Sequence, residues 1–385
     1  MSTNDSSSAA MTCFEYAKRR IAVRWSNEAS LAWLPEFLCP AFQTVDSDSA
    51  DWTISVENDS ELYGQFIQQP SANQPESVEC FTLDGKFKSH ELLQRNGNWL
   101  VARDRKRSII LMIDPNHSKV RILGSPDQRH CRMSVARIIR ELATVHSLSS
   151  GLLHCHGAAF AIGGKAIVLA SVKRSGKTSS LIHAMHQPMA QFITNDRLFV
   201  QCDGERPVVR GMPTIFKIRS KTLDLLPEFG KRRRARPYHF LETLEESERE
   251  FPERRVELFG KCDLETRLST AQFCDLMDVP AVGESTLGAI VFPRISPDVD
   301  HVHIEQLAPE VASHKLFTES LLKASSPQRT ATAFRRSDEP SVLSDENVKR
   351  QCERIVGQVP CYSYAIGPAA YERPFLLDAL QRRAA

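Results

Sequence analysis

Residues 170–180 read ASVKRSGKTSS, and this stretch constrains the fold more than any other part of the sequence. Its end matches the phosphate-loop pattern G-x-x-x-x-G-K-[ST] at Gly176, Lys177 and Thr178, but Ser171 stands where the pattern has its first glycine. In such a loop, backbone N–H groups and a helix N-terminus surround a phosphate, while the lysine reaches the outer phosphates and the hydroxyl binds magnesium. Because serine is the smallest chiral replacement with a hydroxyl, we expect Ser171 to be accommodated at some conformational cost.

The segments on both sides of this stretch decide whether the match is accidental. Residues 152–161 and 165–170 are typical of two strands joined by a turn at Gly163-Gly164, and a helix is expected over about 177–187. The apolar run 192–200 is typical of another buried strand. The GKT therefore lies between a strand and a helix, which is the context that a phosphate loop requires. The expected nucleotide-binding residues are Ser171, Lys173, Arg174, Ser175, Gly176, Lys177, Thr178 and Ser179.

The length of 385 residues and the changes of pattern along the chain predict two domains. Short alternating segments between 51 and 123 indicate an antiparallel sheet. We therefore expect a β-rich N-terminal domain over 1–130, with a disordered tail at 1–12, and a nucleotide-binding domain over 131–385. The fold class is α/β, of a mixed α+β type. Apolar residues from Val135 to Val145 predict a helix at the junction, and further helices are expected near 308–323 and at the C-terminus.

Composition disfavours several classes of protein. The formal net charge of +2 does not by itself support nucleic-acid binding, and the ten cysteines are scattered without a C-x-x-C pair. This cysteine pattern favours a reducing compartment over a disulfide framework or a zinc site. The sequence shows neither a signal peptide nor an uncharged apolar run long enough to cross a bilayer. We therefore expect a cytoplasmic protein that does not act on membranes.

Three further features are candidates for the site. Asp196 ends an apolar run after the expected helix, where a carboxylate can hold Mg²⁺, although an acidic residue there is often only solvated. His156 lies in an apolar strand, where most histidines are structural, but the following Gly157 indicates a close approach to the backbone. The basic run 231–236, KRRRAR, is typical of a solvated loop or of a site for an acidic substrate. It lacks the interleaved aromatic residues that nucleic-acid binding would require.

Together these residues resemble the HPr kinase/phosphorylase superfamily, and more closely its HPr-kinase-related serine kinase branch. His156-Gly157 stands at the family's offset before the phosphate loop, and NDRLFV, which begins at Asn195, is similar to the family's DDRV strand. The stretch RGMPTIFKIRSKTLDLLPEF, which begins at Arg210, is similar to a further element of these kinases. The resemblance covers about 150–225 and implies an HPr-kinase-like P-loop domain that binds ATP and Mg²⁺.

The resemblance also implies roles for individual residues. Lys177 binds the phosphates, Thr178 and Asp196 are the metal ligands, and His156 is an assisting or substitute proton acceptor. Asn195 occupies the position of the family's catalytic base, and a carboxamide cannot take the proton of the substrate hydroxyl. Asp196 is an alternative base. Because phosphoryl transfer depends mainly on positioning and electrostatics, the change at Asn195 need not abolish it.

We therefore expect a Mg²⁺- and ATP-dependent kinase that phosphorylates a hydroxyl of a protein side chain, a peptide or a small metabolite in a biosynthetic pathway. The expected substrate-binding residues are Arg210, Lys231 and Arg232. One alternative is a nucleotide-binding regulatory protein that has lost catalysis. It is favoured by four departures from the family, at Ser171, Arg174, Asn195 and Val208, the last of which stands where the family has a metal-supporting glutamate. Another is a phosphorylase or hydrolase of the same fold. The acceptor, the choice between ATP and GTP, and a homo-oligomeric state stay open.

Overall fold

Two compact units make up the chain in the computed structural model. The first comprises residues up to Leu38, 42–150 and 325–342, and the second comprises 39–41, 151–324 and 343–385. The structure describes residues 10–47, 49–70, 76–83, 86–124, 128–202, 204–218, 229–232, 238–246, 266–322, 332–336, 338 and 343–367. Within these ranges, no helix is both long and apolar enough to span a membrane.

The first unit is built on a nine-stranded sheet with the order β3-β1-β2-β4-β9-β8-β7-β6-β5. Its strands are β1 (Ala10–Tyr16), β2 (Arg19–Trp25), β3 (Gln43–Val45), β4 (Trp52–Glu57), β5 (Ser77–Leu83), β6 (Lys86–Asn96), β7 (Trp99–Asp104), β8 (Ile109–Asp114) and β9 (Lys119–Gly124). Strand β4 is parallel to both β2 and β9, whereas the other pairs are antiparallel. Because β4 has parallel neighbours on both sides, the sheet is mixed and not wholly antiparallel. Parallel neighbours are joined by crossover connections and not by tight hairpins.

The helices of the first unit are α1 (Glu28–Leu38), α2 (Ser60–Ile67), α3 (Gln128–Ser149) and the short 3₁₀-helix η3 (Thr332–Phe334). Helix α3 packs against α1 and contacts β2, β5 and β9. The helical stripe predicted from the sequence is confirmed, since Val135, Ile138, Ile139, Leu142 and Val145 are all buried. Burial of this apolar stripe removes it from water and attaches the helix to the sheet.

The second unit contains an eight-stranded sheet with the order β11-β10-β13-β14-β17-β19-β18, in which β12 also pairs with β10. Its strands are β10 (Leu153–Ile162), β11 (Lys165–Ala170), β12 (Gln191–Thr194), β13 (Arg197–Gln201), β14 (Val208–Met212), β17 (Glu284–Ile295), β18 (Val302–Gln306) and β19 (Cys361–Ile366), with a separate ribbon of β15 (Phe216–Ile218) and β16 (Thr266–Leu268). Strand β17 is parallel to both β11 and β19. The carboxyl ends of these three strands therefore meet at one edge of the sheet.

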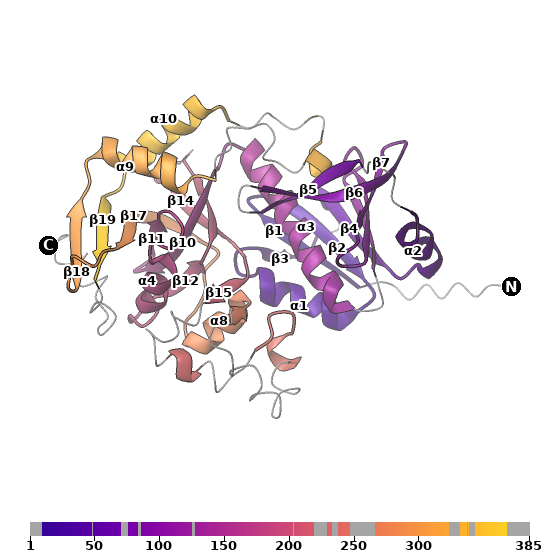
Figure 1. Cartoon of the computed structure of the whole chain (residues 1–385), viewed down its shortest axis with the longest axis horizontal. Helices are drawn as coiled ribbons and strands as arrows, with labels where there is room; N and C mark the ends of the chain where they lie inside the picture. The colour runs from indigo at the N-terminus through magenta and orange to yellow at the C-terminus, as the bar shows by residue number, and fades with distance from the viewer. Residues whose placement is uncertain are drawn as a thin grey trace. The chain divides into compact units, whose positions relative to one another are not determined.

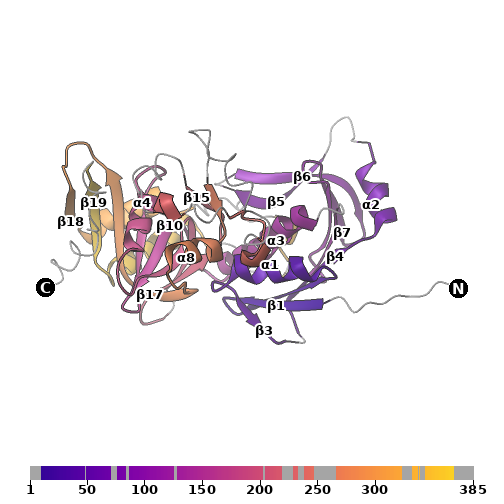
Figure 2. The ribbon, with the colours of Figure 1, turned by 90° about the horizontal axis from the view of Figure 1, so that it is seen from below.

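Helices cover both faces of this second sheet (Figures 1 and 2). They are α4 (Lys177–Ala184), α8 (Thr270–Met277), α9 (Pro309–Lys315), α10 (Asp345–Val356) and the π-helical turn η1 (Leu316–Ser320). Because side chains alternate along a strand, β10 contributes to two cores. Phe160 shares one core with Leu181 of α4, and Cys155 shares the other with Leu316 of η1 and Cys352 of α10.

The predicted elements around residue 170 are confirmed, and two other expectations are wrong. Strands β10 and β11 form a hairpin around Gly163-Gly164, and α4 follows β11. Residues 10–12, expected in the disordered tail, begin β1 because they pair with residues 23–25 of β2. The run 192–200 is two strands, which Asn195 and Asp196 separate. The C-terminal helix expected near 372–383, residues 1–9 and residues 233–236 of the basic run lie outside the described residues.

Candidate functional site

Loop 171–176 joins the carboxyl end of β11 to the first turn of α4. Gly176 is the N-cap residue of α4 and has a φ of 97°, a left-handed conformation that favours glycine. A Cβ atom on Gly176 would lie 3.0 Å from Cδ1 of Ile366 and 3.4 Å from Cγ1 of Ile295. Because Ile366 ends β19 and Ile295 ends β17, the loop lies at the edge where the three parallel strands end.

The missing glycine at Ser171 does not impose the conformational cost that the sequence suggested. Within the loop, positive φ angles occur at Arg174 (67°) and Gly176, and not at Ser171. Ser171 is buried, whereas Arg174 is exposed to solvent. The strained position is therefore Arg174, where a left-handed backbone costs about 1–2 kcal/mol for a residue with a Cβ atom.

Lys177, the first residue of α4, holds its amine against the loop. The residue is buried, and its Nζ donates hydrogen bonds to the carbonyl oxygens of Ser171 (2.7 Å) and Val172 (2.6 Å). Burial lowers the pKa of Lys177 to about 8, while the charges of Asp196 and Glu319 act in the opposite direction. Anions that approach this amine favour its charged form, so the lysine is well placed to receive phosphate groups. Glu319, which the sequence did not single out, is therefore part of the same electrostatic environment.

Strand pairing brings His156 and Asp196 to the same edge of the sheet. Gly157 of β10 pairs with Ala170, the last residue of β11, so His156 lies beside the start of the loop. On the other side of β10, His156 pairs with Arg197, and the N–H of Gly157 donates to the carbonyl oxygen of Asp196 (3.0 Å). The imidazole Nε2 of His156 lies 3.3 Å from Oδ1 of Asp196. A histidine–carboxylate pair and the loop therefore lie together, although they come from three separate segments.

The glycine after His156 has a structural explanation. A Cβ atom on Gly157 would lie 3.0 Å from the carbonyl oxygen of Leu169 in β11. The close approach that Gly157 indicated is therefore made by the neighbouring strand. The Asp196 carboxylate lies between two basic side chains, since Nε of Arg197 is 3.7 Å from its Oδ2. About a third of the Asp196 side chain is exposed (36%), so a ligand can reach it.

Asn195 lies in the turn between β12 and β13, and its side chain is fixed there. Its Oδ1 accepts a hydrogen bond from Oγ1 of Thr214 (2.8 Å). The hydroxyl of Thr194 donates to the carbonyl oxygens of Arg197 (2.9 Å) and Met212 (3.2 Å), which anchors the turn to β14. With its oxygen engaged by Thr214, the amide of Asn195 can offer N–H donors. Sequence reasoning missed Thr214 because strand pairing, and not local spacing, places it here.

Oxygen donors suited to magnesium lie beside the loop. Thr178 is half-buried in the first turn of α4, and the buried Ser175 hydroxyl has no hydrogen-bond partner among the residues that the structure describes. Mg²⁺ prefers oxygen ligands and is usually held by one or two carboxylates together with phosphate oxygens and water. Thr178 and Asp196 carry oxygen donors of this kind, and their role as metal ligands stays a prediction. In the part of the chain that the structure describes, no three His, Cys, Asp or Glu side chains gather to hold a metal by themselves.

Arg210 lies on the same face of the sheet as the histidine. It pairs with Phe199 of β13, which pairs with His154 of β10 and stacks on its ring, at 4.4 Å between centroids. Directly paired residues share a face, and so do residues two apart, so Arg210 and His156 project to the same side. The guanidinium of Arg210 forms an ion pair with Glu284. A role of Arg210 in substrate binding stays a prediction.

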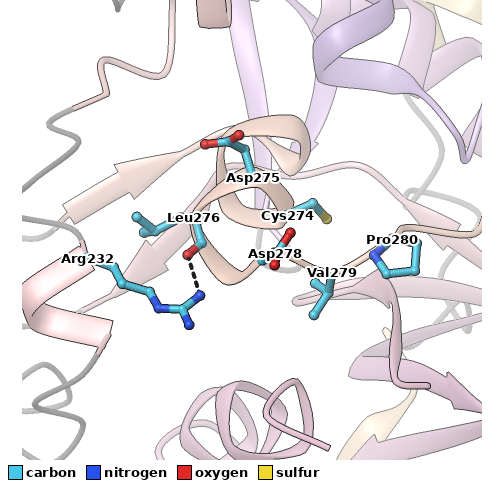
Figure 3. A pocket seen from close by; sticks show the side chains of 7 residues that line it. All are labelled: Arg232, Cys274, Asp275, Leu276, Asp278, Val279 and Pro280. Atoms are coloured by element: carbon cyan, nitrogen blue, oxygen red, sulfur yellow. Dashed lines mark hydrogen bonds between the residues drawn. The ribbon is translucent and has the colours of Figure 1, made fainter. Parts of the chain in front are cut away.

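Arg232 lies at a different place. It lines a cavity of about 680 Å³, and its Nη1 donates to the carbonyl oxygen of Leu276 (3.3 Å) (Figure 3). A second cavity shares Arg232 and is also lined by Gly163 and Gly164. That turn is at the end of β11 opposite to loop 171–176, roughly 16 Å away for a six-residue strand. The structure therefore does not bring Arg232 to the edge of the sheet where loop 171–176 lies. The substrate-binding role of Lys231 and Arg232 stays a prediction.

The edge of the second sheet that holds loop 171–176, His156 and Asp196, called the loop edge below, is therefore a candidate site. No protein-family model matches the chain, and no curated protein matches it significantly. The arrangement combines a loop at a helix N-terminus, a buried lysine, a histidine–carboxylate pair and an oriented amide. Such a set of groups can hold phosphates and can accept or direct a proton beside them.

Proposed function

We propose that this chain is a phosphotransferase of the HPr kinase/phosphorylase type, which uses a magnesium nucleotide, ATP, to phosphorylate a hydroxyl group. The observation that carries the proposal is the convergence of Lys177 with the His156–Asp196 pair at one edge of the sheet. A loop at a helix N-terminus binds phosphate, and a kinase acting on a hydroxyl benefits from a proton acceptor beside the transferred group.

Each residue of the edge has a role in this proposal. The backbone N–H groups of loop 171–176 and the amine of Lys177 hold the phosphates. Thr178 and Asp196 would hold Mg²⁺, which would neutralise phosphate charge. The hydroxyl oxygen of the acceptor forms a bond to the γ-phosphorus while the bond to the β–γ bridging oxygen breaks and ADP leaves. The hydroxyl proton passes to the imidazole of His156, which Asp196 contacts, and the amide of Asn195 orients the acceptor by donating hydrogen bonds.

The test is transfer of labelled γ-phosphate from ATP by the purified full-length protein to a panel of hydroxyl compounds, namely serine, threonine, seryl peptides and sugars. We expect Asp196→Asn to lower transfer about a hundredfold, as loss of a metal ligand does, while the fold is retained. Asp345→Asn is the matched control, because Asp345 is an exposed carboxylate in α10. Unchanged transfer in Asp196→Asn contradicts the proposed metal ligand, and nucleotide binding without transfer to any acceptor contradicts the kinase.

One observation favours a second candidate, a regulatory protein that binds a nucleotide without turning it over. Asn195 stands where the resemblance implies a catalytic base, and Thr214 fixes its amide as a donor. A carboxamide cannot remove a proton. Asn195→Asp separates the two candidates, because a carboxylate at the position where the resemblance implies a base should raise transfer if the protein is a kinase. A regulatory protein would bind nucleotide equally well in both forms and show no transfer in either.

A further inference from the structure

The two cavities that Arg232 lines lie next to each other, away from the loop edge. The first is at the end of α8 and the second is beside the Gly163-Gly164 turn, and each has a volume of about 680 Å³. They share four lining residues, Arg232, Asp278, Val279 and Pro280. Sites for small molecules typically have volumes of roughly 300–1,000 Å³. The proposed phosphoryl transfer uses neither cavity, so their role is open.

Two opposite charges line this shared space. Nη1 of Arg232 donates to the carbonyl oxygen of Leu276 (3.3 Å), and Asp278, two positions further along, is the C-cap residue of α8. Figure 3 shows both charged groups on the same side of the last turn of α8. Within the described ranges, Arg232 and Asp278 form no ion pair with each other or with another side chain. A guanidinium has five N–H donors, so Arg232 keeps donors for a ligand after its bond to Leu276.

The other carboxylate of the first cavity is already engaged. Oδ2 of Asp275 accepts a hydrogen bond from the hydroxyl of Tyr238, and its side chain points away from Arg232 (Figure 3). The shared space therefore offers a ligand one cation and one anion. A purely anionic ligand would be repelled by Asp278 and a purely cationic one by Arg232, whereas a molecule that carries both charges is attracted by each.

The second cavity adds an apolar wall, which includes Met185, Met189, Met277 and Val279. Met185 and Met277 belong to the buried core, whereas Met189 is 77% exposed. Met189 also has a φ of 63°, a left-handed conformation that is uncommon for a bulky residue. An exposed apolar side chain in a strained conformation is a reason to look for a ligand. Methionine side chains are flexible and adapt to apolar groups of different shapes.

We propose that the two cavities form one binding site for a free α-amino acid with an apolar side chain. The ligand's carboxylate lies against the guanidinium of Arg232, its ammonium group lies against the carboxylate of Asp278, and its side chain lies against the methionines. The site is at the end of α4 opposite to Lys177, because Met185 is the C-cap residue of that helix. It is therefore separate from the loop edge, and the inference does not depend on the proposed function.

The test is isothermal titration calorimetry of the full-length protein with L-leucine, without nucleotide. Two matched probes each lack one charge of leucine: isocaproate lacks the ammonium group and isoamylamine lacks the carboxylate. We expect saturable binding of leucine and an affinity at least about tenfold lower for each probe, because a charge-assisted hydrogen bond is lost. Glycine, which carries both charges but no apolar side chain, should also bind more weakly than leucine.

Two variants assign the charges to residues. Asp278→Asn keeps a residue that tolerates the left-handed C-cap conformation, and Arg232→Gln keeps an N–H donor for the carbonyl oxygen of Leu276. Each should lower the affinity for leucine about tenfold or more. In addition, Asp278→Asn should no longer distinguish leucine from isocaproate, and Arg232→Gln should no longer distinguish leucine from isoamylamine. Asp345→Asn and Arg350→Gln, at exposed positions in α10, are the matched controls.

Three results would overturn the inference. The first is a lack of saturable leucine binding by the wild-type protein. The second is isocaproate binding as tight as that of leucine, which would define a site for simple carboxylates. The third is an unchanged leucine affinity in both variants, which would place the bound amino acid elsewhere. A nucleotide titration of the same wild-type protein tests the proposed function separately, so a failure of one leaves the other intact.

Discussion

The pKa of Lys177 provides the sharpest test of the loop. Burial lowers this pKa from 10.5 to about 8 in the nucleotide-free protein, against the raising effects of Asp196 and Glu319. When phosphates bind, their negative charges favour the ammonium form, so the pKa returns toward its ordinary value. Only the ammonium form makes the charged contact, so nucleotide affinity should fall as pH rises through about 8.

The size of this effect follows from the fraction of protonated lysine. With a pKa of about 8, roughly nine-tenths of the lysine is charged at pH 7 and roughly one-tenth at pH 9. The dissociation constant for a nucleotide should therefore rise about tenfold between these two pH values. At pH 8, binding should take up about half a proton from the buffer, and at pH 6 almost none.

Isothermal titration calorimetry with a non-hydrolysable ATP analogue measures both quantities. Titrations in two buffers with different ionisation enthalpies give the proton uptake, and the series from pH 6 to 9 gives the affinity. Lys177→Arg is the control, because arginine stays charged over this range and should show weaker but pH-independent binding. A wild-type affinity that stays flat from pH 7 to 9, or a Lys177→Arg protein with the wild-type slope, would refute the reasoning.

The remaining predictions concern stability. Arg174→Gly should be neutral or stabilise the protein by up to about 1 kcal/mol, because relief of the left-handed backbone offsets the added chain entropy of glycine. Ser171→Gly should instead destabilise it by about 0.5–1 kcal/mol, since Ser171 has no positive φ to relieve. Urea unfolding of both variants checks this, and the reverse order would show that the strain was assigned to the wrong residue. Arg137→Met should stabilise the first unit, because burial lowers the pKa of Arg137 to about 10 and its buried Nη1 has no hydrogen-bond partner among the described residues. The penalty amounts to at most about 3 kcal/mol at neutral pH. Unchanged or lower stability of the methionine variant at pH 7 would contradict it.

Local patterns in the sequence were sufficient to predict the elements around the loop. The hairpin at Gly163-Gly164, the strand before Ser171 and the helix from Lys177 all follow from short-range periodicity and turn residues. The position of His156 beside the loop also follows from short-range pairing, because a two-stranded hairpin fixes the register between its strands. Short-range patterns in the sequence therefore predicted most of the elements that form the loop edge.

Residues that reach the edge by long-range pairing could not be predicted in this way. Thr214 follows β14 in the chain, and it reaches Asn195 because β13 pairs with β14. Thr214 belongs to the stretch from Arg210 that is similar to the kinases, but no local spacing within that stretch indicates Asn195 as its partner. The same reasoning explains Arg232, which was assigned to the substrate from the charge of its neighbours and lies on a cavity near the Gly163-Gly164 turn.

The sequence motif and the backbone dihedral angles identify different positions in loop 171–176 as the ones that need glycine. A sequence pattern marks positions where glycine is common, and it places the departure at Ser171. The dihedral angles show where glycine is needed, and they identify Gly176 and Arg174. The exposed arginine occupies a conformation that glycine would adopt freely, which no pattern based on residue types could reveal.

The largest error in the predicted secondary structure is also the feature that forms the site. An uninterrupted strand over 192–200 would pair Asn195 and Asp196 into the sheet, with side chains on opposite faces. The break between β12 and β13 instead turns the backbone, and Thr194 anchors it through the carbonyl oxygens of Arg197 and Met212. This turn directs the Asp196 carboxylate toward His156 while Thr214 holds the Asn195 amide. A polar pair that interrupts an apolar run is therefore better interpreted as a turn at a site than as part of the strand, and this criterion would have located the break from sequence.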